Sequence, residues 1–447
     1  MTGMTIEKAL RACGGRYIGE GRLDVELGRV VIDSREVAPG DLFVAYKGER
    51  VDGHDYISAS LDRGAACCLA ERVPEGEKRG VIVTDDVQRA LEDIAAAYRD
   101  TLALPIVGVT GSVGKTSAKE MLSAVLSSRW KVCKTDKNLN NQIGVPMTLS
   151  RIAPDDGIAV VEMGISGFGE MSRLARMVRP RIAVYTLIGH AHLEFLHDLD
   201  GVLRAKTEMI DYLPGDGLVV MNGDDVKLRS FDCPRRRIFV GLGEDCAVRA
   251  ENIVPSAEDT RCEIVSGSRR IAVRIPAFGK HLVYAALEAA AVGMELGLSD
   301  EEIARGIASF AIVGRRAAVV RTEKITLLDD CYNSNAEALR SGIDSLLELP
   351  GRHVCILGDM LELGDTAREA HYSSGVYAAQ KGVARLLCCG EHAGAYCDGA
   401  GAIARRFADR AALIAALGEE IRPGDCVLVK ASRGAHFEEI SEALKVL

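Results

Sequence analysis

The chain has 447 residues, of which 48% are hydrophobic and 27% charged, and its net charge is −9. A chain of this length is too long for one hydrophobic core and predicts roughly two to four domains of an ordinary globular protein. The acidic charge argues against nucleic acid as the main partner, because nucleic acid requires a basic face. The first residues lack the pattern of a signal peptide and no apolar run approaches membrane-spanning length. We therefore expect a cytoplasmic protein that does not insert stably into a membrane.

The 13 cysteines include no C-x-x-C pair, and the doublets Cys67-Cys68 and Cys388-Cys389 lie in apolar surroundings. Such cysteines are typical of buried, reduced thiols in a cytosolic protein. We expect neither a disulfide framework nor a zinc site.

The first block, residues 1–102, contains short strand-like segments such as 28–33 and 41–45, broken by Gly and Pro. It ends in a helix-like stretch at 87–101 and contains no phosphate-binding loop. The pattern predicts a small mixed α/β domain.

The segment 109–117, Val-Thr-Gly-Ser-Val-Gly-Lys-Thr-Ser, follows an apolar strand-like run and precedes a helix-like stretch. This order is the context of a phosphate-binding loop, although Val109 replaces the leading Gly of the full Walker A pattern. Glycines let backbone N–H groups surround phosphate oxygens, and the helix N-terminus adds partial positive charge. Lys115 is placed to reach the β- and γ-phosphates, and the Thr116 hydroxyl to bind Mg²⁺. Rather than an ordinary turn, we predict a nucleotide site formed by Gly111, Ser112, Val113, Gly114, Lys115, Thr116 and Ser117.

The second block, residues 103–314, alternates strands and helices. Strands are expected at 106–109, 130–134, 158–161, 182–186 and 218–221, and helices at positions that include 169–178 and 202–213. This alternation predicts a mostly parallel sheet covered by helices on both faces. Between 245 and 275 the pattern is purely strand-like, which predicts an antiparallel extension of the same domain, and an Ala-rich helix follows at 281–296.

The third block, residues 315–447, alternates again. Strands are expected at 325–328, 354–357, 386–389 and 426–429, and helices at 336–347, 367–380 and 437–446. The order predicts a doubly wound, Rossmann-like domain, but without G-x-G-x-x-G it does not indicate a dinucleotide. The predicted fold class is therefore α/β with three domains.

Polar residues follow the strands of the second block, at the edge where α/β sheets bind ligands. Glu162 ends one strand and either holds a Mg²⁺ bound to ATP or faces solvent, and the phosphate loop favours the metal. His190 and His192 are, by spacing alone, more typical of polar loop residues than of metal ligands. Lys206, on a predicted helix, is by itself an ordinary surface lysine.

Three further polar segments either bind ligands or simply form turns and helix caps. The amide-rich run 138–146 could contact phosphates or sugars. In the third block, residues 329–335 follow a strand and could hold a ribose, and residues 430–433 are a candidate anion site.

Together these segments resemble the Mur ligases, ATP-dependent amide-forming enzymes of peptidoglycan precursor synthesis, over nearly the whole chain. The matching motifs of the first block are 33–35, 39–45, Gly48 and 52–54. Those of the second block are 110–116, 138–146, 162–164, 192–194 and Lys206, and those of the third are 329–335, 357–364 and 428–430. The Gly-Asp-Met-x-Glu-Leu-Gly run at 358–364 is the most specific, and it resembles the members that join D-alanyl-D-alanine to UDP-N-acetylmuramoyl-tripeptide.

The resemblance implies a UDP-sugar-binding domain at 1–102, a central ATP-binding ligase domain at 103–314 and a Rossmann-like domain at 315–447. ATP would phosphorylate the terminal carboxylate of the UDP-linked tripeptide. The amine of D-alanyl-D-alanine would attack the acyl phosphate, releasing ADP and phosphate. Such an enzyme is expected to be a cytoplasmic monomer that serves cell-wall biogenesis, cell shape and cell division.

The resemblance also implies roles for single residues. The catalytic residues are Lys115, His192 and Lys206, with Thr116, Glu162, His192 and Lys206 as ligands of two Mg²⁺ ions and Lys206 carrying a carbamate made with CO₂. The nucleotide contacts outside the loop are Arg315, near the γ-phosphate, and Asp330, Asn333 and Asn335. The substrate contacts are Ser34, Arg35, Gly48, His54, Asn138 and Asn141.

The chain departs from the family pattern at Leu282 and Ala285, where the family usually has asparagines, and at Leu187 and Ala431. The resemblance therefore implies which residues bind the phosphates and the metal ions, but it does not imply which residues contact the adenine ring. Two alternatives remain open. One is another ligase of the superfamily, of the amino-acid-adding or folylpolyglutamate type, against which the motif at 33–53 argues. The other is a non-catalytic nucleotide-binding regulatory protein, in which the candidate metal ligands would be superfluous.

Overall fold

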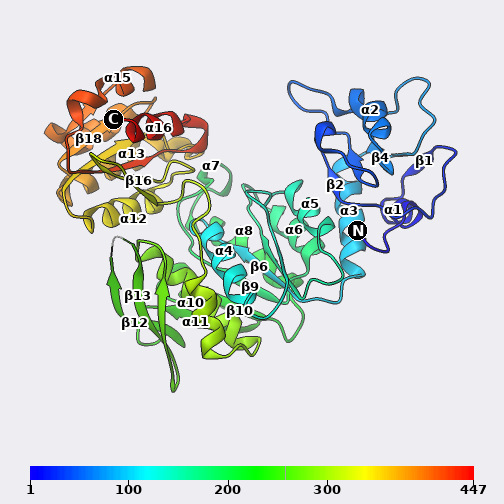
Figure 1. Cartoon of the computed structure of the whole chain (residues 1–447), viewed down its shortest axis with the longest axis horizontal. Coiled ribbons are helices and arrows are strands. Elements are labelled where there is room, and N and C mark those ends of the chain that lie inside the picture. The colour runs from blue at the N-terminus through cyan, green and yellow to red at the C-terminus, as the bar shows by residue number, and fades with distance from the viewer. Residues whose placement is uncertain (257) are drawn as a thin grey trace.

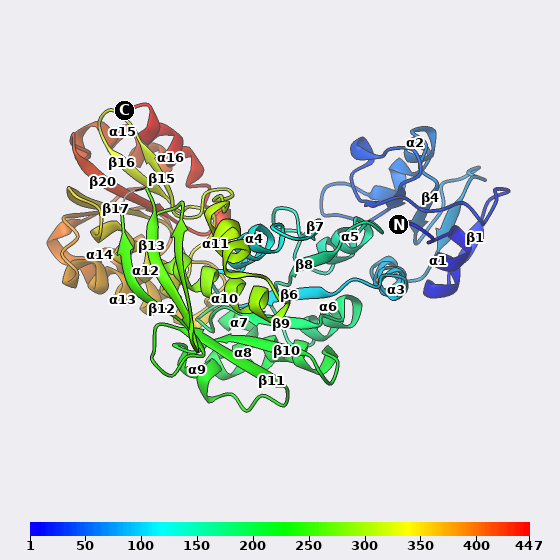
Figure 2. The same cartoon turned by 60° about the horizontal axis from the view of Figure 1, so that its bottom comes forward.

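In a computed structural model that describes residues 1–256 and 258–447, the chain forms three β-sheets flanked by helices (Figure 1). The sheets follow one another along the chain, with five strands within residues 16–83, nine within 106–275 and six within 318–430. The parts that contain the two termini lie on either side of the nine-stranded sheet (Figures 1 and 2). No helix of the described residues is long and apolar enough to cross a bilayer.

The N-terminal sheet has the order β1-β5-β4-β3-β2, with β1 antiparallel to β5 and the other pairs parallel. Its elements are α1 (Ile6–Cys13), β1 (Arg16–Ile18), β2 (Val30–Val31), η1 (Ser34–Glu36), β3 (Leu42–Val44), η2 (Gly53–Tyr56), α2 (Ile57–Asp62), β4 (Cys67–Ala70), β5 (Val81–Val83) and α3 (Val87–Asp100). The strand expected at 28–33 is reduced to two residues. The reason is that Asp33 accepts the N–H of Arg35 and so starts the 3₁₀ turn η1.

Helix α3 joins the first two sheets. Tyr98 donates its hydroxyl to the carbonyl of Ile152 at 2.6 Å, and the N–H of Val30 donates to Ser150 Oγ at 3.0 Å. Met147 of the next part packs into the N-terminal hydrophobic core. These contacts fix the N-terminal part against the nine-stranded sheet.

The nine-stranded sheet has the order β14-β13-β12-β11-β10-β9-β6-β8-β7. Its strands and helices are β6 (Ile106–Thr110), α4 (Lys115–Leu126), β7 (Val132–Lys134), α5 (Gly144–Ser150), β8 (Ile158–Glu162), α6 (Glu170–Val178), β9 (Ile182–Tyr185), α7 (Leu193–Leu196), α8 (Leu199–Thr207), η3 (Glu208–Tyr212), β10 (Leu218–Asn222), α9 (Val226–Ser230), β11 (Arg236–Gly241), β12 (Val248–Pro255), β13 (Thr260–Ser266), β14 (Arg269–Ile275), α10 (His281–Glu295) and α11 (Asp300–Ala308). Strands β6 to β11 are parallel, whereas β13 is antiparallel to β12 and β14. The predicted parallel sheet with an antiparallel extension is confirmed.

Alternate residues of the central strands face two different cores. Val107 and Val109 of β6 pack with α4 and α10, whereas Ile106 packs on the other face with α5, α6 and α8. Both faces are buried, so the strands are continuously apolar rather than alternating. The helix expected at 202–213 instead changes from α8 to the 3₁₀ turn η3 after Thr207, whose hydroxyl donates back to the carbonyl of Leu203 at 2.8 Å.

The C-terminal sheet has the order β15-β16-β20-β17-β18-β19, with only β15 antiparallel. Its elements are β15 (Ala318–Arg321), β16 (Thr326–Asp329), α12 (Ala336–Leu347), β17 (Arg352–Leu357), η4 (Gly364–Thr366), α13 (Ala367–Gln380), β18 (Arg385–Cys388), α14 (Ala393–Ala400), η5 (Gly401–Ile403), β19 (Ala404–Arg406), α15 (Arg410–Glu420), β20 (Asp425–Lys430), η6 (Arg433–Ala435) and α16 (Glu438–Lys445). The doubly wound prediction is confirmed. Phe278, just before α10, packs into this part's core, and Lys280 pairs with Glu348 at 2.8 Å.

Candidate active site

The loop at 111–114 connects β6 to α4 at the carboxyl edge of the nine-stranded sheet. Gly111 has a φ of 150°, and a Cβ there would lie 2.0 Å from Thr186 Oγ1. Gly114 has a φ of 87°, in the left-handed region, and helix α4 starts at the next residue. Only glycine fits the close approach at position 111. The result is a compact turn that directs the N-terminus of α4 at the space above the sheet, as phosphate binding requires.

Lys115 folds back over this loop. Its Nζ donates to the carbonyl of Gly111 at 2.6 Å and to that of Ser112 at 3.4 Å. Burial lowers the pKa of Lys115, the carboxylate of Glu162 opposes this shift, and the cation of Arg316 adds to it. The Lys115 amine thus lies at the mouth of the loop. The oxygens of a phosphate bound there would be stronger hydrogen-bond acceptors than the neutral carbonyls that Lys115 now contacts.

Thr116 and Glu162 form a buried polar contact at the site. Thr116 Oγ1 donates to Glu162 Oε2 at 3.0 Å, and Asn140 Nδ2 donates to Oε1 at 2.8 Å. The Nζ of the buried Lys119 lies 3.8 Å from the same carboxylate, which is itself 1% exposed. A hydroxyl beside a buried carboxylate is an oxygen donor set that suits Mg²⁺, with phosphate oxygens and water as the remaining ligands. Among the described residues no group of three or more His, Cys, Asp or Glu side chains lies close enough together to hold a metal ion.

Lys206 lies near the end of α8 and is 1% exposed. Burial lowers its pKa well below the usual value, and the positive charge of Lys115 lowers the pKa further. The expectation of an ordinary surface lysine is wrong, because the helix turns this side chain into the protein.

His192 lies just before α7, with a left-handed φ of 55°. Its Nδ1 is 2.6 Å from Glu362 Oε2, which belongs to the C-terminal part. Its neighbour His190 is hydrogen-bonded through Nδ1 to Glu337 of α12. Helix α7 therefore contacts η4, and Figure 1 shows α7 beside the C-terminal part.

The two arginines at the start of the C-terminal part point in different directions. Arg315, for which the resemblance implies a γ-phosphate contact, pairs with Asp329 at 2.6 Å and with Glu442. Arg316 lies over the ring of Tyr332, with Cζ 4.0 Å from the centroid. Arg316 also lines, with Thr116, a hollow of about 10 Å³, which has room for about one water molecule. In this conformation Arg316 rather than Arg315 is the arginine beside the loop.

The other predicted nucleotide contacts make bonds within the C-terminal part. Lys430 Nζ donates to the Asp330 carboxylate and to the carbonyl of Asn333, the latter at 3.0 Å. Asn335 caps α12 by accepting the N–H of Ala338 at 2.9 Å. These residues therefore act here as turn and cap residues, which is one of the two roles left open by the sequence.

The predicted UDP-sugar residues lie in two settings. The Arg35 side chain is 87% exposed and pairs with Asp33, Ser34 precedes it in η1, and the Gly48 N–H closes a turn onto the carbonyl of Val51. By contrast, His54 is buried, with Nδ1 2.6 Å from Asp52 and Nε2 accepting the N–H of Glu71 at 3.1 Å. Both nitrogens of His54 are engaged, so the ring holds its own loop in this conformation.

Asn138 and Asn141 lie before α5. Asn141 Oδ1 accepts the N–H of Gly144 at 2.9 Å and thus caps the helix, and the Asn138 carbonyl accepts the N–H of Asn140 at 2.8 Å. This turn aims the Asn140 amide at Glu162, so the amide-rich run contacts the candidate metal ligand directly.

Sequence reasoning missed five residues that the structure places at the site: Asn140, Lys119, Thr186, Arg316 and Glu362. A signal existed for Lys119, which is one helical turn after Lys115 and therefore on the same face of α4. Asn140 and Glu362 lie within the runs 138–146 and 358–364 that the sequence does mark, although neither residue stands out in its run. No local signal marks Thr186 or Arg316, because each meets the site from a different element.

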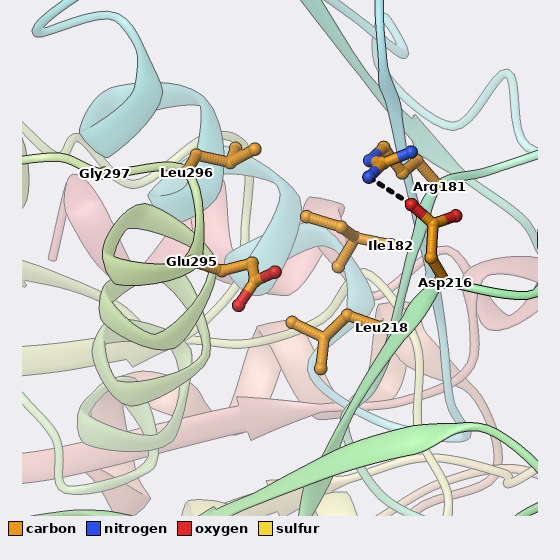
Figure 3. A pocket seen from close by; sticks show the side chains of 7 residues that line it. All are labelled: Arg181, Ile182, Asp216, Leu218, Glu295, Leu296 and Gly297. Carbon is orange, nitrogen blue, oxygen red and sulfur yellow. Dashed lines mark hydrogen bonds and ion pairs between the residues drawn. The ribbon is translucent and has the colours of Figure 1, made fainter.

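A hollow of about 410 Å³ lies at the opposite edge of the sheet (Figure 3). It is lined by Arg181, Ile182, Asp216, Leu218, Glu295, Leu296 and Gly297. Arg181 and Asp216, paired at 2.7 Å, precede β9 and β10, whereas the phosphate loop follows β6. The carboxyl ends of parallel strands lie at one edge of the sheet and their amino ends at the other. This hollow, at the amino ends, is therefore remote from the phosphate loop and is not the nucleotide site.

Comparisons with known proteins agree with this geometry. The profile "Mur ligase family, catalytic domain" matches residues 26–104, "Mur ligase middle domain" matches 109–293 and "Mur ligase, glutamate ligase domain" matches 315–433. The chain is 34% identical over 426 residues to the UDP-N-acetylmuramoyl-tripeptide–D-alanyl-D-alanine ligase of Bacillus subtilis, covering 93% of this chain and 92% of that relative.

Two solved structures are similar over almost the whole chain. One, of MurF from Acinetobacter baumannii, superposes with a TM-score of 0.91 at 29% identity and covers 99% of both chains. The other, MurF ligase from Thermotoga maritima in complex with ADP, superposes with a TM-score of 0.85 at 28% identity and covers 95% of this chain and 98% of that one. The phosphate loop, the order of its three sheets and these similarities together show that the chain belongs to the Mur ligase family.

Proposed function

We propose that this protein is an ATP-dependent ligase that joins D-alanyl-D-alanine to UDP-N-acetylmuramoyl-tripeptide in peptidoglycan precursor synthesis. The contact between Thr116 in the phosphate loop and the buried Glu162 carries the proposal, because it brings together a hydroxyl and a carboxylate that would hold the Mg²⁺ of a bound nucleotide. The identity of the substrates is proposed from the similarity of the chain to ligases with this activity, which extends over nearly all of their length.

The three sheets support a division into three domains. We assign the UDP-sugar to residues 1–102, ATP to residues 103–314, and the dipeptide with part of the nucleotide site to residues 315–447. The reaction would take place in the cytoplasm, where ATP and nucleotide-linked precursors are the available substrates.

The residues of the central domain act on the phosphoryl group that moves from ATP to the tripeptide carboxylate. Lys115 would leave its two carbonyl acceptors and neutralise charge that spreads over the transferring group. A Mg²⁺ ion held by Thr116 and Glu162 would supply further positive charge against the phosphates. Asn140 and Lys119 orient the Glu162 carboxylate.

Lys206 and His192 are the proposed ligands of a second Mg²⁺. A lysine ammonium repels a metal cation, whereas a carbamate formed from the neutral amine and CO₂ offers anionic oxygens. The lowered pKa of the buried Lys206 favours the neutral amine that this modification needs. The second metal site thus depends on a modified side chain.

The proposal is tested by measuring ADP release from the purified protein. With ATP, Mg²⁺, UDP-N-acetylmuramoyl-tripeptide and D-alanyl-D-alanine together, we expect ADP, phosphate and the UDP-linked pentapeptide in equal amounts. Omitting the dipeptide or the tripeptide should abolish steady ADP release. Turnover with a folate and glutamate, or with a single amino acid in place of the dipeptide, would indicate another ligase of the superfamily. ATP binding without any product would indicate a regulatory protein.

A further inference from the structure

The segment 430–433, a candidate anion site by its sequence, begins at the last residue of β20. The polar segment 329–335 begins at the last residue of the neighbouring parallel strand β16. Both segments therefore lie at the carboxyl edge of the C-terminal sheet, the edge at which α/β sheets bind ligands. The Lys430 ammonium donates to the Asp330 carboxylate and so ties the two segments together. Arg433 remains as the exposed cation of the first segment.

Two guanidinium groups lie over the ring of Tyr332. The Cζ of Arg316 is 4.0 Å from the ring centroid, and the Cζ of Arg433 is 5.5 Å from it. The attraction between a cation and an aromatic face holds both groups near one place. Unlike Arg315, which pairs with Asp329, neither guanidinium has a carboxylate partner among the residues that the structure describes. Because like charges repel, an anion bound beside this ring would stabilise the arrangement.

This group of cations lies toward the central domain. Arg316 lines a small hollow together with Thr116 of the phosphate loop, and its positive charge lowers the pKa of Lys115. Arg433 meets the same ring from the C-terminal sheet. An anion bound by the two arginines would therefore lie at the junction of the two domains, on the C-terminal side of the phosphate loop.

All three reactants of the proposed reaction carry anionic groups, and their places in the molecule differ. The phosphates of ATP have Lys115 and the N-terminus of α4. The UDP-tripeptide, with its diphosphate and carboxylates, is assigned to residues 1–102, which lie on the other side of the nine-stranded sheet from the C-terminal part (Figures 1 and 2). The dipeptide is assigned to the C-terminal domain. In an extended dipeptide the carboxylate lies about 7 Å beyond the amine, and it keeps its charge throughout the reaction.

We infer that Arg433, held over Tyr332 beside Arg316, binds the carboxylate of D-alanyl-D-alanine and so directs the amine of the dipeptide toward the central domain; this inference rests on the proposed function. A guanidinium suits this role because its planar fork matches the two oxygens of a carboxylate. Arg433 makes the contact because it is the exposed member of the pair, and Arg316 adds positive charge beside it. The segment 430–433 would thus place the acceptor, as the phosphate loop places ATP.

The test compares the full-length parent protein with Arg433→Gln on two acceptors, D-alanyl-D-alanine and D-alanyl-D-alaninamide, whose C-terminus is a neutral amide. In the parent we expect kcat/KM to be about 10- to 100-fold higher for the acid than for the amide, the range for one charge-assisted contact. Arg433→Gln should lower kcat/KM for the acid by about the same factor and leave kcat/KM for the amide within a few-fold. The two acceptors then become nearly equal.

Controls separate the carboxylate contact from other effects. Arg368→Gln removes an exposed arginine of the same domain, paired with Asp398, and should leave both acceptors unchanged. In Arg433→Gln the exchange of labelled ADP into ATP, with the tripeptide and without dipeptide, should persist because it needs no acceptor. An equal fall for both acceptors, an unchanged preference for the acid, or an effect confined to the KM for ATP or the tripeptide would overturn the inference. Absence of product from the parent protein would instead overturn the proposed function.

Discussion

Lys115 and Lys206 have the same side chain but different surroundings. Lys115 donates hydrogen bonds to carbonyl oxygens at the mouth of the phosphate loop, where its positive charge would attract a bound phosphate. Lys206 is fully buried, and its pKa is lowered by burial and by the nearby Lys115. One lysine therefore suits binding of an anion, and the other suits reaction as a neutral amine.

Replacing Lys115 with alanine is expected to abolish turnover and to leave the fold intact. Loss of a positioned cation on a transferring phosphoryl group costs on the order of 10²-fold or more in kcat. Lys131→Ala, at an exposed residue of the same domain, should keep kcat within a few-fold. Steady-state ADP release measures both, and a Lys115→Ala variant with near-normal kcat would contradict the role of this lysine.

Lys206 is expected to be carbamylated in the active protein. Activity should fall in CO₂-depleted buffer and return with bicarbonate, while Lys206→Arg, which cannot form a carbamate, should be nearly inactive. The matched substitution Lys227→Arg, at a lysine paired with Asp200, should have little effect. The mass of the intact protein in bicarbonate, and its ADP release, report the modification. Normal activity of Lys206→Arg would refute it.

At the scale of single elements, patterns local in sequence were predicted well. Helices α12 and α13 begin and end where the sequence predicts, because caps and periodicity act within one turn. The segments at 28–33 and 202–213 differ, because a side chain from a turn or a distant residue competes for the backbone hydrogen bonds. Helix α10 is a further case: its buried face carries Glu288 among alanines.

Glu288 makes stability depend on pH. Burial raises its pKa to about 8, so the folded chain keeps a proton that the unfolded chain has lost above its usual pKa of 4.5. Stability is then greatest below the unfolded pKa and falls as pH rises toward 8, by about 1.4 kcal/mol per pH unit for one proton. We expect Glu288→Gln to remove this slope and Glu244→Gln, at an exposed residue, to keep it. Urea unfolding between pH 5.5 and 7.5 measures the slope, and equal slopes in the parent and Glu288→Gln would contradict the prediction.

At the scale of the whole molecule, the candidate nucleotide contacts are divided between two domains. The phosphate loop belongs to the central domain, whereas Asp330, Asn333 and Asn335 follow β16 of the C-terminal domain. The hollow between Thr116 and Arg316 has room for about one water molecule, and we expect the domains to shift when a nucleotide binds between them. Neither the central nor the C-terminal domain alone would exclude water from an acyl phosphate bound between them.

We therefore expect the molecule to become more compact when an ATP analogue and the UDP-substrate are both bound. The segment around Gly314, which has a left-handed φ of 73°, is the expected hinge. Small-angle scattering should show a smaller radius of gyration with both ligands, and Lys115→Ala, with weakened phosphate binding, should show a smaller change. Unchanged dimensions at saturating ligand would contradict domain closure.

The sequence by itself determined the features that depend on neighbouring residues. The strand, loop and helix at 106–126, the alternation that predicts two parallel sheets, and the motifs that resemble the Mur ligases are all contiguous. Hydrogen bonding within a helix or turn and the period of apolar residues are local, so they can be read from the chain directly.

Only the tertiary structure decided which distant residues meet. The sheet order places β8 beside β6, and this order brings Glu162 to Thr116 across 46 residues. It also decided that Arg316 rather than its neighbour faces the loop, that Lys206 is buried, and that Glu362 reaches His192. Strand order and the backbone angles of linkers set these contacts, and neither leaves a periodic signal in the sequence.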